Sequence, residues 1–197
     1  MLARMDDTHA RQATAPAAAE TSYIPGTDMS RFIREMMEFV GLGEPDVAAI
    51  RGSAPFVLRH ADRLTAALYE HFLAFPRSAR FFLREDGSVD TERIERRKHS
   101  LTRWLRETAE VATTSEFSYY LLAVAISHSN RAERPGGNIP PHLMIGAMSL
   151  AQTALAGVFA AELPREESTA ASLAWNKLLL VHLSVLLLGY LPVRRIP

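Results

Sequence analysis

The chain has 197 residues, no cysteine, and 22 basic against 22 acidic residues, so its formal net charge is zero. This length fits one domain with a substantial core. A neutral chain has no electrostatic footprint for nucleic acid or an anionic membrane surface, and we expect neither partner. The lack of cysteine excludes disulfides, zinc–thiolate sites and cysteine nucleophiles, and we expect a cytoplasmic protein.

Residues 1–22 are small and polar and lack the apolar segment of a signal peptide, which predicts a flexible tail before one domain over 23–197. The most apolar run, LLLVHLSVLLLGYL at 178–191, is too short to span a bilayer. It favours a buried or dimer-forming helix.

Apolar residues recur at helical spacing along the chain and strand-like alternation is nearly absent, which predicts an all-α fold of seven or eight helices. Capping residues and prolines give the approximate helix limits. FFLREDGSVDT is predicted to be a turn. The expected helices run from a cap at 27–30 to Val40, and over 45–53, 55–75, 91–108, 115–131, 141–161 and 166–191.

One histidine stands out because it follows apolar residues on a single helical face. Phe117, Leu121, Val124 and His128 share that face, so His128 is expected to point inward. Two interpretations stay open. The imidazole is either a core histidine with an ordinary hydrogen bond, or a ligand to a haem iron on an apolar wall.

The preceding predicted helix has a mainly apolar face. This face is suited to cover a flat apolar ligand on the side opposite His128. Its members are Ile94, Arg97, Leu101, Trp104, Leu105 and Thr108. Arg97 either reaches a carboxylate at the ligand's edge or extends to solvent. Tyr69 lies among apolar residues of an earlier helix, so its hydroxyl either meets an iron-bound ligand or reaches water at the core boundary.

Three segments occur in order: LTAALYEHFLAFPRSARFF, REDGSVDTERIERRKHSLTRWLRET, and AISHSN followed by PHLMIGAMSL. They resemble the protoglobins, single-domain relatives of the globin domains of globin-coupled sensors. The resemblance covers the chain from about Tyr23 to Tyr190. Its most specific parts are the DG turn leading to Arg103 and Trp104, and the histidine followed by IG at 145–146.

The resemblance implies an expanded, globin-like three-over-three helical sandwich with an additional N-terminal helix and segment, holding haem b. It implies that His128 is the proximal iron ligand, that Tyr69 can hydrogen-bond a bound ligand, and that Leu101 lies over the iron. The residues expected to contact the haem are Tyr69, Phe82, Arg97, Leu101, Trp104, Tyr120, Val124, Ile145 and Met148.

The chain also departs from the family pattern. Leu68 stands where archaeal members carry tryptophan, and Leu101 replaces an aromatic residue, so a roomier distal pocket is expected. Arg97 stands where the family tends to be apolar. If it points inward, it is either a second donor to bound dioxygen or a clamp on a haem propionate.

The expected function is reversible binding of O2, CO or NO at a five-coordinate haem iron. No residue demands catalysis, although an open haem can support secondary redox chemistry. The alternative is a gas-sensing regulatory module that acts through a dimer or a separate partner. The two long helices over 141–161 and 166–191 are the expected homodimer surface.

Overall fold

The computed structural model describes residues 22–110, 114–130, 133 and 136–196. Every regular element in these ranges is helical, which confirms the predicted all-α class, and the predicted tail falls outside them apart from Ser22. The long helices are α1 (Met29–Phe39), α2 (Glu44–Arg59), α3 (Ala61–Ala74), α5 (Thr91–Ala109), α6 (Ser115–Ser129), α7 (Pro141–Glu162) and α8 (Arg165–Leu188). The short ones are η1 (Pro25–Thr27), α4 (Pro76–Ala79) and η2 (Arg80–Phe82).

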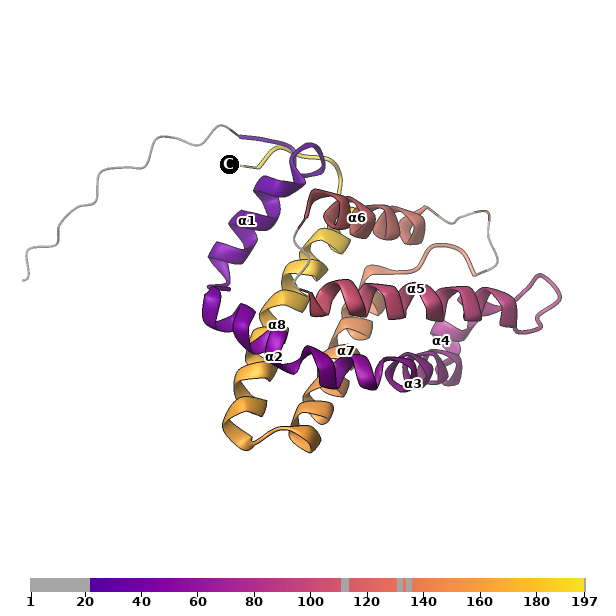
Figure 1. Cartoon of the computed structure of the whole chain (residues 1–197). Coiled ribbons are helices and arrows are strands. Elements are labelled where there is room, and N and C mark those ends of the chain that lie inside the picture. The colour runs from indigo at the N-terminus through magenta and orange to yellow at the C-terminus, as the bar shows by residue number, and fades with distance from the viewer. Residues whose placement is uncertain (1–21, 111–113, 131–132, 134–135, 197) are drawn as a thin grey trace, which may run out of the picture.

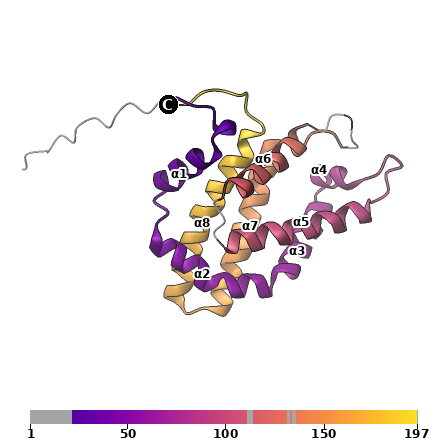
Figure 2. The ribbon, with the colours of Figure 1, turned by 45° about the horizontal axis from the view of Figure 1, so that its top comes forward.

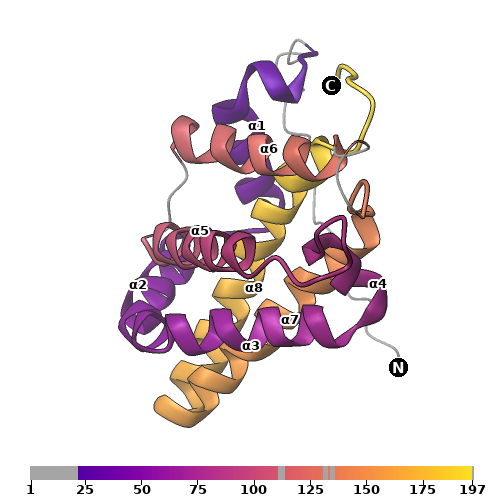
Figure 3. The ribbon, with the colours of Figure 1, turned by 90° about the vertical axis from the view of Figure 1, so that its right-hand side faces the viewer.

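The helices form two crossed layers. α7 and α8 make an antiparallel hairpin, and α3, α5 and α6 cross in front of it in the view of Figure 3. α6 packs on α8, whereas α5 packs on α2 and α3 (Figure 1). α1 lies outside the layers against α6 and α8 (Figure 2), as expected for an additional N-terminal helix.

Several helices begin where the sequence offers a side-chain cap. The carboxylate of Asp28 accepts a hydrogen bond from the Arg31 amide at 3.0 Å, and Asp90 does the same for Arg93 at 3.0 Å. Each cap satisfies one of the amide donors that a helix start leaves without an intrahelical partner. The predicted starts of α1 and α5 are therefore confirmed.

The predicted helix boundary near residue 54 is wrong. α2 continues through Pro55 to Arg59, and α3 begins directly after His60. A proline inside a helix removes one backbone hydrogen bond, but Ile50 and Val57 on either side are fully buried. We attribute the continuation to this packing, because buried apolar area outweighs the loss of a single hydrogen bond.

The predicted turn between α3 and α5 begins two residues later than expected. The first residues of FFLREDGSVDT complete η2, and the chain then turns so that the amide of Arg84 donates to the carbonyl of Ser88 at 2.8 Å. Leu83 and Val89 form an isolated antiparallel bridge at the base of this turn.

The core is built around α8, which is apolar on nearly all sides and is contacted by α1, α2, α6 and α7. Its Trp175 is 1% exposed, and the indole Nε1 donates to the Oγ of Ser53 on α2 at 2.9 Å. Ser53 in turn donates to the carbonyl of Ala49 at 2.7 Å. This buried polar link fixes the position of α2 on α8.

Replacement of Ser53 by alanine is expected to lower the free energy of unfolding by about 1–3 kcal/mol, because the buried indole N–H then has no acceptor. Denaturant unfolding followed by circular dichroism measures the change. Ser127→Ala is the matched control, since Ser127 makes a similar bond to a helix carbonyl but is exposed. An equal, small effect of the two substitutions would contradict the role given to Ser53.

The two ends of the described chain lie side by side. The amide of Tyr23 donates to the carbonyl of Ile196 at 3.0 Å, and the amide of Ile196 donates back to Tyr23 at 2.8 Å. The Tyr23 hydroxyl donates to Glu35 at 2.6 Å, and the Arg31 guanidinium lies over its ring. These contacts attach the end of the chain to α1.

Two helices are long and apolar enough to cross a membrane by length and composition alone. They are α7 and α8, and the most apolar windows of these helices are 22% and 56% buried within the fold. A core helix of a globular protein meets the same criteria, and α8 is such a helix here because it is packed on several sides.

Candidate functional site

A cavity of about 650 Å³ opens among α3, α5, α6 and α7. Its volume lies in the range of about 300–1,000 Å³ that is typical of small-molecule and cofactor sites. All but one of the residues expected at the site line it: Tyr69, Phe82, Arg97, Leu101, Trp104, Tyr120, Val124, His128 and Met148. Four long helices and the short η2 therefore bring the predicted residues to one space.

His128 lines this cavity from the last turn of α6. Val124, one turn earlier, and Leu121, two turns earlier, line the same cavity, as their helical spacing predicts. Phe117 is buried but packs elsewhere, with its ring 5.3 Å from that of His182. The carbonyl of His128 accepts a hydrogen bond from the amide of Ile139 at 3.0 Å. Ile139, which follows the loop after α6, therefore lies next to the histidine backbone.

The loop after α6 is held close to η2 by a glycine. Gly136 has φ +84°, and a Cβ at this position would lie 2.6 Å from the carbonyl oxygen of Arg80. Only glycine meets both requirements, because other residues are strained at this φ and would collide with the η2 backbone. Ile139, which follows this contact, completes the cavity wall beside His128.

Tyr69 lines the cavity from α3 and is 7% exposed. Phe72 and Phe82 pack edge-to-face against its ring, with centroid distances of 5.8 Å and 5.6 Å. Burial raises the pKa of the Tyr69 hydroxyl to about 12, although the positive charge of Arg97 acts in the opposite direction. The hydroxyl is therefore protonated near neutral pH and can donate a hydrogen bond.

After α6 and α3, α5 is the third helix that contributes residues to the cavity lining. Arg97, Leu101 and Trp104 recur at helical spacing and all line the cavity. Leu101 also lines a smaller adjoining cavity of about 300 Å³, together with Leu68. Leu68 and Leu101 each line both cavities and therefore lie where the two cavities share a wall.

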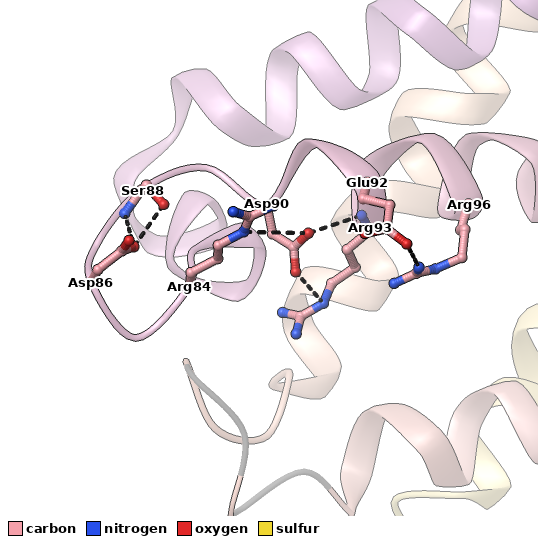
Figure 4. A network of polar contacts seen from close by, with 7 residues as sticks. All are labelled: Arg84, Asp86, Ser88, Asp90, Glu92, Arg93 and Arg96. Atoms are coloured by element: carbon pink, nitrogen blue, oxygen red, sulfur yellow. Dashed lines mark hydrogen bonds and ion pairs between the residues drawn. The ribbon is translucent and has the colours of Figure 1, made fainter.

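Arg93 is a lining residue that the sequence did not identify. Figure 4 shows its guanidinium beside Asp90, with Nε 3.2 Å from the carboxylate, at the start of α5. Its Nη1 is buried and has no hydrogen-bond partner among the described residues. Arg93 lies one turn before Arg97, but it stands in the charged run ERIERRK, which is typical of a solvated face.

Ile145 is the one expected site residue that the structure places outside the cavity. It is 48% exposed, whereas Met144 and Met148 on either side line the cavity. Successive residues of a helix point about 100° apart, so Ile145 points in a different direction from Met144. Gly146 and Ala147 also line the cavity and were not expected there.

Comparisons with known proteins agree with the fold. Residues 29–194 match the family Protoglobin. The globin domain of a Geobacter sulfurreducens globin-coupled sensor is similar in structure, with TM-score 0.63, 16% identity, and coverage of 80% of this chain and 96% of that one. No curated protein sequence matches the chain.

The ferric form of the globin domain of E. coli DosC is also similar, with TM-score 0.64, 15% identity, and coverage of 79% of this chain and 97% of that one. The ferrous form has TM-score 0.63 and 16% identity over the same shares of the two chains. These likenesses confirm the predicted globin-like sandwich. With the family match spanning almost all of the described residues, the chain belongs to the protoglobin family.

Proposed function

We propose that this chain binds haem b in the large cavity, with the iron held by His128 and five-coordinate, and that it reversibly binds O2, CO or NO. Membership of the protoglobin family supports a haem- and gas-binding globin. The observation that carries the finer proposal is that His128 and the buried Tyr69 line one mainly apolar cavity from different helices.

The cavity's side chains fit such a group. Leucine, valine, methionine and aromatic side chains suit a porphyrin ring, and the imidazole of His128 is a good iron ligand. The buried Nη1 of Arg93 can donate to a propionate carboxylate. Arg93 therefore takes the propionate role in this proposal, and Arg97 is left to act beside Tyr69.

Haem supplies an iron that binds diatomic gases, and the protein's own residues set the conditions for that binding. Tyr69 stays protonated because burial raises its pKa, so it donates a hydrogen bond to partial negative charge on a bound ligand. Leu68 and Leu101 give the cavity apolar side chains on α3 and α5, which disfavour water there. A water-poor cavity slows oxidation of the ferrous state, as reversible binding requires.

A sensing role is the second candidate, and exposed apolar residues on α7 and α8 favour it. Leu173 and Leu180 lie two turns apart on α8 and are 60% and 42% exposed, and Ile145 on α7 is also exposed. We propose that α7 and α8 form a homodimer surface in the cytoplasm, through which a change at the site could reach a partner. Concentration-dependent mass, measured with and without CO, tests this candidate.

Titration of the purified protein with haem tests the main proposal. The expected result is a Soret band that saturates at one haem per chain, and that shifts when the ferrous protein receives CO. The observed stoichiometry distinguishes one specific site from non-specific adsorption. A folded protein that takes up no haem, or that shows no CO shift, would remove the gas-binding proposal.

A further inference from the structure

Two tyrosines line the cavity, and they differ in their contact with the surface. Tyr69 on α3 is 7% exposed, whereas Tyr120 on α6 is only half-buried. The other three tyrosines of the chain, all within the described residues, lie outside the cavity lining. Tyr120 is therefore the cavity tyrosine that is best placed to exchange electrons and protons with the solvent.

The contacts of the Tyr120 ring show where it reaches the surface. The guanidinium of Arg103 lies over this ring, 5.3 Å from its centroid. The Arg103 side chain is 64% exposed and is not among the lining residues. Phe117 stacks on the same ring with centroids 6.0 Å apart, which holds it in position. A single phenol ring thus separates the cavity from a solvent-exposed group.

The surroundings of Tyr120 favour the loss of an electron together with a proton. The positive charge of Arg103 opposes a second positive charge on the ring, so an oxidised Tyr120 is stable only without its phenolic proton. Water can accept that proton at a half-buried position. Tyr69 differs, because burial raises its pKa to about 12 and the hydroxyl keeps its proton.

We propose that Tyr120 is redox-active in the haem-loaded protein and passes electrons from small phenols at the surface to the cavity, in a peroxidase reaction. The inference rests on the proposed function, because bound haem supplies the reduction of hydrogen peroxide to two molecules of water. That reduction consumes two electrons and two protons. Two phenol molecules supply them, and each becomes a phenoxyl radical. In each half of the reaction Tyr120 loses one electron and one proton and regains both from a phenol.

The phenol would meet Tyr120 outside the cavity, beside Arg103. An exposed guanidinium can stack on an aromatic ring and can donate a hydrogen bond to a phenolic oxygen. The substrate therefore does not have to enter the space that haem would fill. This adds small phenols, as electron donors, to the diatomic gases of the proposed function.

The first measurement locates the radical in the wild-type protein. The haem-loaded protein is treated with hydrogen peroxide and a nitroso spin trap, and peptide mass spectrometry identifies the residue that carries the trap. We expect the trap on Tyr120, and a tyrosyl signal in the electron paramagnetic resonance spectrum of a rapidly frozen sample. No substitution is needed, so the result does not depend on the folding of a variant.

Tyr120→Phe keeps the ring that packs on Phe117 and removes the phenolic hydroxyl. We expect it to lose the tyrosyl signal and to oxidise guaiacol, a small phenol, more slowly per bound haem. Tyr119→Phe is the matched control, because it removes a hydroxyl from the adjacent residue, which is 42% exposed and lies outside the cavity lining. It should keep both the signal and the rate.

Three results would overturn the inference. The first is a trap on another residue, such as Trp104 or Tyr69, which also line the cavity. The second is an equal rate of guaiacol oxidation in Tyr120→Phe and wild type, and the third is a haem-loaded wild type that forms no radical. In each case the haem is bound and the proposed function stands. A wild-type protein without haem uptake would remove the proposed function and this inference together.

Discussion

The His128→Gly protein is expected to lose the iron ligand of the cavity and to recover it when free imidazole is added. Glycine removes the ring and leaves a space of similar size, which imidazole can enter from solution. At metal sites the loss of an outer-shell partner alone typically costs about 10–100-fold in affinity, so loss of the ligand itself should cost more. Haem affinity and the ferrous Soret spectrum, each with and without imidazole, measure the change.

His71→Ala is the control for this prediction. His71 also lines the cavity but is exposed and lies on α3, so its loss should leave the spectrum unchanged. A His128→Gly protein with the wild-type spectrum and no response to imidazole would show that another residue holds the iron. The proposed role of His128 would then be wrong.

Gly189→Ala is expected to destabilise the fold by about 3 kcal/mol, the upper part of the usual range for an overpacked core. A Cβ on Gly189 would lie 2.6 Å from the Cβ of Ala125 and 2.8 Å from its carbonyl carbon. Backbone atoms cannot rotate away as a flexible side chain can, so α6 and the end of α8 would have to separate. Denaturant unfolding measures the loss.

The same substitution should disturb the site, because Ala125 lies on α6 one turn before His128. We therefore expect a weaker affinity for haem in Gly189→Ala than in the wild type. Gly157→Ala is the matched control, since nothing lies within 4 Å of a Cβ at Gly157. Alanine in a helix interior should stabilise α7 by about 0.5–1 kcal/mol. Equal stabilities of the two variants would contradict the close approach at Gly189.

Helix limits were predictable where a local chemical signal sets them. Asp28 and Asp90 are side-chain caps, and Pro141 stands at the first position of α7, so the starts of three helices could be inferred from sequence. Pro55 misled the prediction because its effect depends on tertiary packing. The burial of Ile50 and Val57 against other helices has no signature in the local sequence.

Helical periodicity was sufficient to predict which residues of one helix face the site together. Arg97, Leu101 and Trp104 share a face by spacing alone, and so do Val124 and His128, and the structure brings these faces to one cavity. The rotation of α7 follows a loop, where periodicity gives no information, and Ile145 turned out to lie on the outer side. Arg93 was missed because its side chain lies among charged neighbours, and only the fold shows that its Nη1 is buried.

The pairing of Tyr23 with Ile196 has a topological consequence. Two backbone hydrogen bonds join Tyr23 to Ile196, so the described part of the chain begins and ends at nearly the same place. If these two residues are joined and the chain is opened at another point, each helix keeps the same neighbouring helices. Adjacent ends are the condition under which circular permutation is tolerated. A short linker between these two residues would allow the chain to begin at a surface turn such as 84–88 and still form the same layers.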